Sequence, residues 1–323
     1  MTERTIDHSG KDALPPKRKQ TREEWLEERR SGIGGSDVAP ILGMSKWSTP
    51  YTVYADKRGE LEPQPENIDM LIGTLFEPWL FAQYKTLTGV AIRKSHKILR
   101  DKEHPFLLAN VDALHKDRVV EFKTARNSDD WGQPGTDQVP QAYLLQCQHY
   151  MRVTGKQVCD LGVLFKDQRI PEVILYEIHR DDDLISIVVP KLVEFWECVQ
   201  NGIPPAAVSP SDALAKWRRA EPVKVAADPA LEKKHSELLR VRAAMSDLKT
   251  LEDTLKTEIM EYMQESDTLT DSMGEILATW KAASDSVRVD SKLVKALYPE
   301  IAKECSKVVP GSRRFLLKGL SDE

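Results

Sequence analysis

The sequence predicts an α/β fold in which a mixed central sheet is flanked by helices, with a long helix and a small β-hairpin after it. Three observations predict this arrangement. Between residues 21 and 203, segments with helical apolar spacing alternate with short runs of β-branched and aromatic residues. A proline-rich stretch follows. Beyond residue 230, apolar residues keep helical spacing over about nine turns.

The first helix is expected to begin after Thr21, because Thr21 and Glu24 have the spacing of a capping box, and to run into a glycine-rich turn at 31–37. Two adjacent apolar stripes predict a long helix over 67–88, which Gly89 ends. The remaining core elements are expected to be strands over 90–92, 106–114 and 119–124, a helix over 141–153, strands near 158–165 and 173–179, and a helix near 184–200.

Five prolines between Pro204 and Pro229 exclude a continuous helix or a central strand there. The chain therefore divides into a flexible tail at 1–20, a core at 21–203, a linker at 204–230 and a C-terminal extension at 231–323. Within the extension, the long helix is expected to be followed by a hairpin over 276–289, a short helix and a strand-like segment at 314–317.

The composition, with 41% hydrophobic and 30% charged residues, is that of a globular protein. Its length of 323 residues is enough for one large or two medium domains. No hydrophobic run exceeds four residues, which excludes a membrane-spanning helix. The absence of an apolar segment after Met1 and the four scattered cysteines predict a cytoplasmic protein with reduced thiols. A net charge of −5 argues against broad polyanion binding, although residues 84–100 carry five Lys and Arg and no carboxylate.

The strongest chemical pattern is Asp112 followed by Glu121 and Lys123. Glu121 and Lys123 are two residues apart on a predicted strand, so they project from the same face, and Asp112 lies near the end of the preceding strand. Two carboxylates and the backbone carbonyl of Phe122 suit Mg²⁺, and Mn²⁺ accepts the same ligands. A metal held there would activate water and bridge a phosphate, while Lys123 stabilises charge. The pattern indicates phosphodiester hydrolysis, although the triplet alone also fits a solvated hairpin.

Two further polar residues lie on predicted helices. Glu77 follows Gly73 by four residues and has apolar neighbours, so the long helix brings a carboxylate close to another element; a solvated Glu, or a helix that begins at Pro78, are the alternatives. Gln148 lies on an apolar face, where an amide needs partners. It either hydrogen-bonds a catalytic water or DNA, or is a structural amide satisfied by the backbone.

The glycine-rich turn offers a phosphate site. The backbone N–H groups of Gly34 and Gly35, the Ser36 hydroxyl and the Arg29 guanidinium together suit a terminal phosphate. A plain turn, with Ser36 as the N-cap of a helix that starts at Asp37, is equally compatible.

Five blocks follow one another along the chain: Trp25-x3-Arg29-x3-Ile33-Gly34-Gly35-Ser36-Asp37-Val38 with Gly43, then Gly73-Thr74-Leu75-Phe76-Glu77, then Val111-Asp112, then Glu121-Phe122-Lys123, and Gln146-Cys147-Gln148-x5-Thr154-Gly155. In this order they resemble the YqaJ-like viral recombinase family, which includes the phage lambda exonuclease and belongs to the PD-(D/E)XK nucleases. The resemblance spans about residues 22–200.

The resemblance implies a restriction-endonuclease-like core and a Mg²⁺-dependent, ATP-independent exonuclease. Such an enzyme degrades one strand of duplex DNA from an end, 5′ to 3′, by two-metal hydrolysis, and leaves 3′ overhangs for phage-type recombination. The family also implies a homotrimer that encircles DNA and a single-strand annealing protein as partner. Carried over by motif, the site residues are Asp112 and Glu121 as metal ligands with Glu77 contributing, Lys123 as the catalytic lysine, Gln148 as a residue that positions the nucleophile or metal water, and Arg29 and Ser36 as 5′-phosphate ligands.

The sequence departs from the family where Ala113 replaces the glycine that often follows the aspartate, and the four cysteines do not fit the iron–sulfur arrangement of some related nucleases. The region after residue 204 lies outside the pattern. Two other functions remain compatible with the residues: a structure-specific or nicking endonuclease with the same core, and a non-catalytic DNA-end-binding scaffold organised around the long helix.

Overall fold

The computed structural model describes residues 21–61, 67–95, 97–308 and 311–319. The predicted tail at 1–20 lies outside them. The chain forms two compact units, Met1–Lys216 and Trp217–Glu323, and their boundary falls inside the segment expected to be a linker. A short helix, α7 (Pro210–Lys216), ends the first unit.

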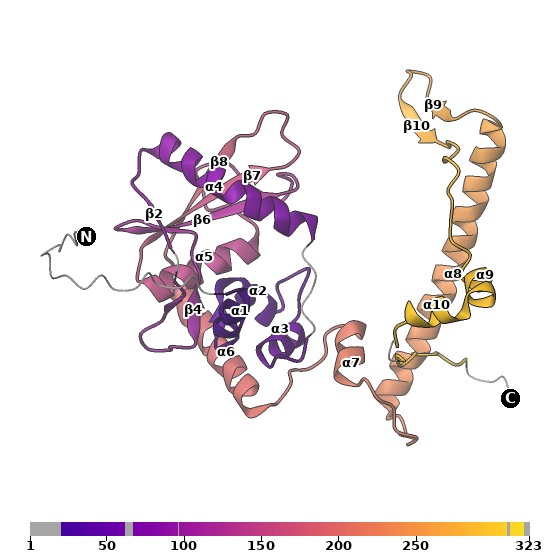
Figure 1. The fold of residues 1–323 in the computed structure, drawn as a ribbon, viewed down its shortest axis with the longest axis horizontal. Coiled ribbons are helices and arrows are strands. Elements are labelled where there is room, and N and C mark those ends of the chain that lie inside the picture. Colours follow the sequence, from indigo (N-terminus) through magenta and orange to yellow (C-terminus); the bar gives the residue numbers. More distant parts are fainter. Residues whose placement is uncertain (1–20, 62–66, 96, 309–310, 320–323) are drawn as a thin grey trace, which may run out of the picture. The chain divides into compact units, whose positions relative to one another are not determined.

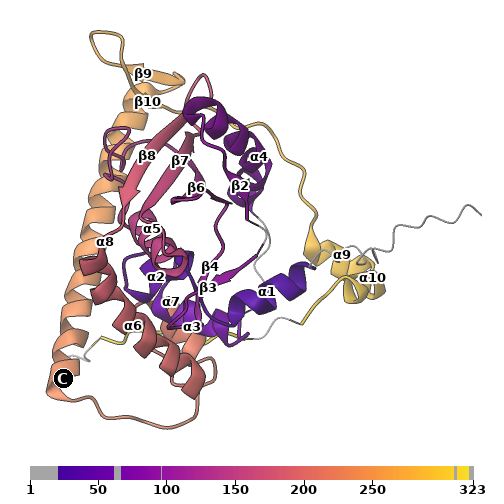
Figure 2. The ribbon, with the colours of Figure 1, turned by 90° about the vertical axis from the view of Figure 1, so that its left-hand side faces the viewer.

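A five-stranded mixed sheet is the centre of the first unit (Figures 1 and 2). Its strands lie in the order β2 (Arg93–Lys94), β5 (Ala113–Leu114), β6 (Arg118–Ala125), β7 (Val158–Phe165) and β8 (Val173–His179). β6 and β7 run parallel, and the other neighbours are antiparallel. The predicted mixed sheet is therefore confirmed, and β7 and β8 have the predicted bounds.

Helices pack against both faces of this sheet. On one face, Leu80 and Tyr84 of α4 (Ile68–Thr88) pack with Val120 and Phe122 of β6. On the other face, Val119 of β6 packs in a second core with α5 (Gln141–Thr154) and α6 (Asp182–Asn201). Successive residues of β6 thus alternate between the two cores, as a pleated strand requires. The predicted fold class, a mixed sheet flanked by helices, is confirmed.

Helix α4 has the bounds that the apolar stripes predict. Asn67 caps its first turn by accepting the N–H of Met70, and Gly89 ends it with φ +67°. A glycine adopts this left-handed conformation without the steric penalty of a Cβ atom. Pro78 lies inside the helix, so the alternative in which the helix begins at Pro78 is wrong.

A second, three-stranded sheet has the order β1 (Ile33–Gly34), β4 (Leu107–Ala109) and β3 (Leu99–Arg100). The single strand expected over 106–114 is therefore two strands, because β4 belongs to this sheet and β5 to the central one. The break between them, at residues 110–112, carries Asp112 to the junction of the two sheets. The strand expected at 90–92 lies slightly later, as β2.

The predicted capping box is present in α1 (Arg22–Arg30), where Thr21 and Glu24 cap each other. Helix α2 (Gly35–Ile41) starts earlier than expected: Gly34 is its N-cap, and Asp37 accepts the Gly34 N–H at 2.8 Å. The alternative with Ser36 as N-cap is therefore wrong. A further helix, α3 (Pro50–Lys57), follows α2.

The second unit is dominated by α8 (Pro229–Met263), followed by a hairpin of β9 (Thr268–Thr270) and β10 (Ile276–Thr279), and by α9 (Ser291–Leu297) and α10 (Pro299–Glu304). The strand that pairs with β10 precedes it, whereas the sequence suggested one that follows. The predicted strand at 314–317 is irregular. In the part of the chain that the structure describes, no helix has the length and apolarity needed to cross a membrane.

Candidate active site

Strand β6 brings a carboxylate and an amine together on one face, as the spacing predicts. Lys123 Nζ lies 2.7 Å from Glu121 Oε1, and Glu121 is 4% exposed. Burial alone would lower the pKa of Lys123, but the adjacent Glu121 carboxylate outweighs this and raises that pKa above its usual value. The lysine therefore stays protonated beside the carboxylates.

Asp112 completes the group from the break between the two sheets. Its Oδ2 accepts the backbone N–H of Phe122 at 2.8 Å, which fixes the carboxylate against β6. Burial, and then the charge of Glu121, raise the pKa of Asp112 to about 8. Without a cation, the Asp112 carboxyl therefore retains a proton at neutral pH.

One buried oxygen in this group lacks a hydrogen-bond partner. Glu121 Oε1 binds Lys123 and Gln146, whereas Glu121 Oε2 is buried and unpaired within the described residues. A buried carboxylate oxygen without a donor is costly, and such oxygens are the ligands that Mg²⁺ prefers. The residues present therefore fit a divalent cation. The structure brings no three His, Cys, Asp or Glu of the described chain close enough to enclose a metal, so the Phe122 carbonyl and water would complete the shell.

Glu77 projects from α4 toward the same region. Its charge contributes to the raised pKa of Asp112, but its own carboxylate pairs with Lys94 of β2 at 2.6 Å. Glu77 is therefore an ion-paired residue at the rim of the site.

The amide beside the carboxylates is Gln146 and not Gln148. Gln146 Nε2 donates to Glu121 Oε1 at 2.9 Å and lies 2.8 Å from the Tyr150 hydroxyl. The Tyr150 hydroxyl in turn donates to the carbonyl of Asn110 at 3.0 Å, next to the break that holds Asp112. In the sequence, the signal for this pair is an amide and a phenol one helical turn apart on α5.

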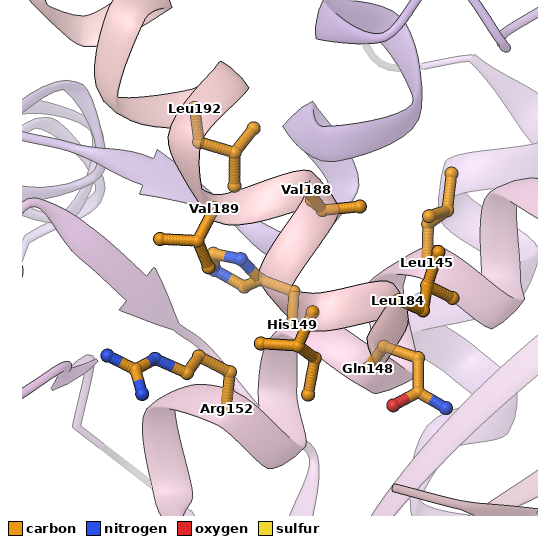
Figure 3. A pocket seen from close by; sticks show the side chains of 9 residues that line it. Leu145, Gln148, His149, Arg152, Leu184, Val188, Val189 and Leu192 are labelled. Carbon is orange, nitrogen blue, oxygen red and sulfur yellow. The ribbon is translucent and has the colours of Figure 1, made fainter. Parts of the chain in front are cut away.

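The hydrogen bonds of Gln148 match the other alternative that the sequence left open, a structural amide. Its Nε2 donates to the carbonyl of His179 at 2.7 Å, and its Oε1 accepts the N–H of Asp181 at 2.9 Å. Figure 3 shows Gln148 beside Leu184 in an apolar pocket between α5 and α6. Both polar atoms are satisfied by the backbone where β8 leads into α6, which favours the structural alternative for Gln148 over a role in positioning a nucleophile.

The predicted phosphate residues come together at the start of α2. Arg29 Nη2 donates to Ser36 Oγ at 3.2 Å, and the guanidinium lies over the Trp25 ring, 5.7 Å from its centroid. Arg29, Ser36 and Tyr150 line one pocket of about 120 Å³. Since Tyr150 also contacts Gln146, this pocket adjoins the carboxylate group.

The close packing of α2 on α5 depends on Gly35. A Cβ atom at this position would lie 2.6 Å from Tyr150 Cε1 and 2.9 Å from Gln146 Cγ. Only a residue without a side chain allows this approach, which sets the separation of the phosphate pocket from Glu121.

A buried ion pair stabilises the turn that holds Arg29 and Ser36. Lys57 Nζ lies 2.6 Å from Asp37 Oδ2 and donates to the Arg29 carbonyl at 3.2 Å. Burial alone would raise the pKa of Asp37, but Lys57 and Arg29 outweigh it and lower that pKa below 3.8. Sequence reasoning missed Lys57, because only the fold places α3 against this turn.

Comparisons with known proteins address the same region. Residues 24–157 match the family model of the YqaJ-like viral recombinase domain. The chain is 28% identical to the uncharacterized protein YqaJ of Bacillus subtilis strain 168 over 323 residues, which cover 96% of this chain and 98% of that protein.

Two solved structures are similar in part. An alkaline exonuclease, LHK-Exo, from Laribacter hongkongensis matches with a TM-score of 0.48 and 24% identity, over 56% of this chain and 94% of that one. A phage related exonuclease from Haemophilus somnus 129PT matches with a TM-score of 0.41 and 15% identity, over 53% of this chain and 95% of that one. The resemblance to the YqaJ-like viral recombinase family that the sequence motifs carry is confirmed, because residues 24–157 match the model of that family's domain.

Proposed function

We propose that this protein is a divalent-metal-dependent, ATP-independent exonuclease that degrades one strand of duplex DNA from an end, 5′ to 3′, and leaves a 3′ overhang. The observation that carries the proposal is the buried, unpaired Glu121 oxygen beside Asp112 and a protonated Lys123. The family domain covers all three residues.

Asp112, Glu121 and the Phe122 carbonyl would hold the cation, with Mg²⁺ or Mn²⁺ as the ion. When bound, the cation supplies Lewis acidity and lowers the pKa of a coordinated water. Lys123 keeps its proton and stabilises the negative charge that develops on the phosphate in the transition state. In a two-metal form of this reaction, Glu77 is the residue that would complete the second site after it leaves Lys94.

Gln146 acts through Glu121. By donating to Glu121 Oε1, it fixes the carboxylate plane and leaves Oε2 as the oxygen available to a metal. Residues that orient a metal ligand in this way usually contribute about 10–100-fold to metal affinity or activity. We assign Gln146, in place of Gln148, to this positioning role.

The pocket of Arg29 and Ser36 supports the 5′ to 3′ direction of degradation. A guanidinium, a hydroxyl and the N–H groups at the start of α2 suit a doubly charged terminal phosphate. A 5′ phosphate anchored there would place the next phosphodiester toward the carboxylates on the far side of Tyr150. Hydrolysis at that bond releases a 5′ mononucleotide and advances toward the 3′ end of the same strand.

The resemblance further supports a homotrimer that encircles DNA in the cytoplasm of the host cell and passes the 3′ overhang to a single-strand annealing protein. The local charge is consistent with contact to DNA. The exposed residues Arg93, Lys94, Lys97 and Arg100 lie on the β2–β3 segment next to Glu77, although the whole chain is acidic.

Hydrolysis of a linear duplex by single variants tests the proposal. Asp112→Ala and Lys123→Ala are expected to lower the rate by at least about 100-fold in Mg²⁺. Lys116→Ala, which removes an exposed amine from the turn between β5 and β6, is the control and should keep the full rate. Full activity of either Asp112→Ala or Lys123→Ala would overturn the assignment.

A further inference from the structure

Helix α8 is 35 residues long, or about 52 Å, and its apolar side chains are exposed along its whole length. In the described part of the second unit, Met263 is the buried hydrophobic residue. An apolar surface of this extent on a helix with no core of its own marks an interaction site.

The exposed apolar residues of α8 alternate in steps of three and four. Leu231, Leu238, Met245 and Ile259 occupy one heptad position (a), and Val241, Leu248, Leu255 and Tyr262 occupy the other (d). This spacing spans about four and a half heptads, which is enough for a stable coiled-coil seam. Its period of 3.5 residues gives a left-handed coiled coil with a partner helix.

The charge of α8 excludes nucleic acid and lipid as the partner. Between residues 229 and 263 the helix carries six Lys and Arg and seven Asp and Glu. A surface that binds a polyanion or an anionic membrane needs a basic excess, which this helix lacks. A second helix of mixed charge matches it better.

We propose that α8 forms a parallel, in-register coiled coil with α8 of a second copy of this chain. The residues that flank the seam favour this partner and this orientation. The flank that follows position d is basic, with Arg242, Lys249 and Lys256, and the flank that precedes position a carries Glu237 and Glu258. A parallel pair places Glu237 of one chain against Arg242 of the other, whereas an antiparallel pair places each basic flank against its own copy.

Two seam positions are polar, Lys234 at position d and Glu252 at position a, and Glu252 fixes the register. Glu252 occupies position a, where it pairs with Lys256 and, at 3.0 Å, with Lys249 of its own helix. A polar residue at one such position specifies alignment at a cost in stability, because any shifted register buries it against apolar neighbours. The two lysines supply the counter-charge in the aligned form.

This association goes beyond the proposed nuclease function and does not depend on it. The seam and its flanks contain no residue of the carboxylate group or the phosphate pocket. A chain that fails to degrade DNA would still form the coiled coil, and a nuclease without the coiled coil would still cut.

Disulfide trapping in the full-length chain tests the geometry. Exposed Cys305 and partly exposed Cys198 are first replaced by Ser; Cys147 and Cys159 are buried. In this background, Val241→Cys and Leu255→Cys, made separately, are each expected to give a covalent dimer under mild oxidation on a non-reducing gel. The two positions are about 21 Å apart on one helix, so no antiparallel pairing brings both against their own copies. Thr250→Cys, on the opposite face of α8, is the control and should stay monomeric.

Exchanging the charges of Glu237 and Arg242 tests whether the partner helix is α8 of a second copy. In the Leu255→Cys protein, Glu237→Lys and Arg242→Glu are each expected to lower the trapped fraction at least about threefold, and the double variant is expected to restore it. Residues five apart do not face each other on one helix, so recovery requires the second chain. Equal trapping at Thr250→Cys and Leu255→Cys, or a double variant no better than the single ones, would overturn the proposal.

Discussion

Replacing Asp112 by Asn is expected to stabilise the metal-free protein at pH 8 and to remove its response to Mg²⁺. The reason lies in the raised pKa of Asp112, about 8 against an ordinary 3.8. Between these two values the folded protein binds a proton that the unfolded chain has lost. Stability therefore falls as the pH rises through this window.

The size of the effect follows from the pKa. Ionising Asp112 in the folded, metal-free protein costs up to roughly 6 kcal/mol, at about 1.4 kcal/mol for each tenfold change in proton affinity. Relaxation of this partly exposed carboxyl reduces the cost, so we expect Asp112→Asn to gain about 2–5 kcal/mol over the wild type at pH 8. Asn is nearly isosteric and accepts the Phe122 N–H without a charge.

Urea unfolding in EDTA at pH 6, 7 and 8 measures this difference. Tryptophan emission reports mainly on the first unit, which holds five of the seven tryptophans, including Trp79 and Trp131 at its two cores. Mg²⁺ at pH 8 should restore the stability of the wild type, since a cation that binds the folded state alone stabilises it and replaces the proton. The variant should gain nothing from Mg²⁺.

Asp137→Asn is the matched control, because it makes the same chemical change at an exposed carboxyl in the loop that precedes α5. It should leave the slope of stability between pH 6 and 8 unchanged. The reasoning is refuted if the wild type and Asp112→Asn differ by the same amount at pH 6 and pH 8, or if Asp112→Asn retains the Mg²⁺ response.

Three further predictions concern the surroundings of the site. Gln146→Ala is expected to lower turnover about 10–100-fold and to weaken Mg²⁺ binding measured by calorimetry, whereas Gln148→Ala should leave both unchanged and affect only the melting temperature. Lys57→Met removes the nearer of the two cations that pair with the buried Asp37 carboxylate and should cost about 3–5 kcal/mol of unfolding free energy in urea; a loss below about 1 kcal/mol would contradict the buried pair. Ser36→Ala should reduce the preference for a 5′-phosphorylated over a 5′-hydroxyl end in a competition digest, and an unchanged ratio would remove Ser36 from the phosphate site.

Local sequence signals predicted the elements that local physics determines. The apolar stripes and Gly89 gave helix α4 its bounds, and the Thr21 and Glu24 spacing gave the first helix its cap. The alternation around Glu121 and Lys123 placed both side chains on one face of β6. Each of these depends on residues within a few positions of each other, where periodicity and capping act.

Long-range contacts explain what the sequence did not predict. The run at 106–114 has uniform β-type composition, yet β4 pairs with β1 in one sheet and β5 pairs with β6 in the other. Only tertiary pairing creates the break that carries Asp112. Likewise, Gln146 and Gln148 both lie among apolar neighbours on α5, and what separates them is contact with Glu121, 25 positions away in the chain.

Digestion of a linear duplex, labelled separately at its 5′ and 3′ ends, beside a closed circle of the same sequence, tests the proposed function most directly. With Mg²⁺, we expect the 5′ label to leave as a mononucleotide, the 3′-labelled strand to be retained as an overhang at early times, and the circle to stay intact; EDTA should stop all release. Cutting of the circle, or binding of the duplex end without any release of label in Mg²⁺, would contradict an exonuclease built on Asp112, Glu121 and Lys123.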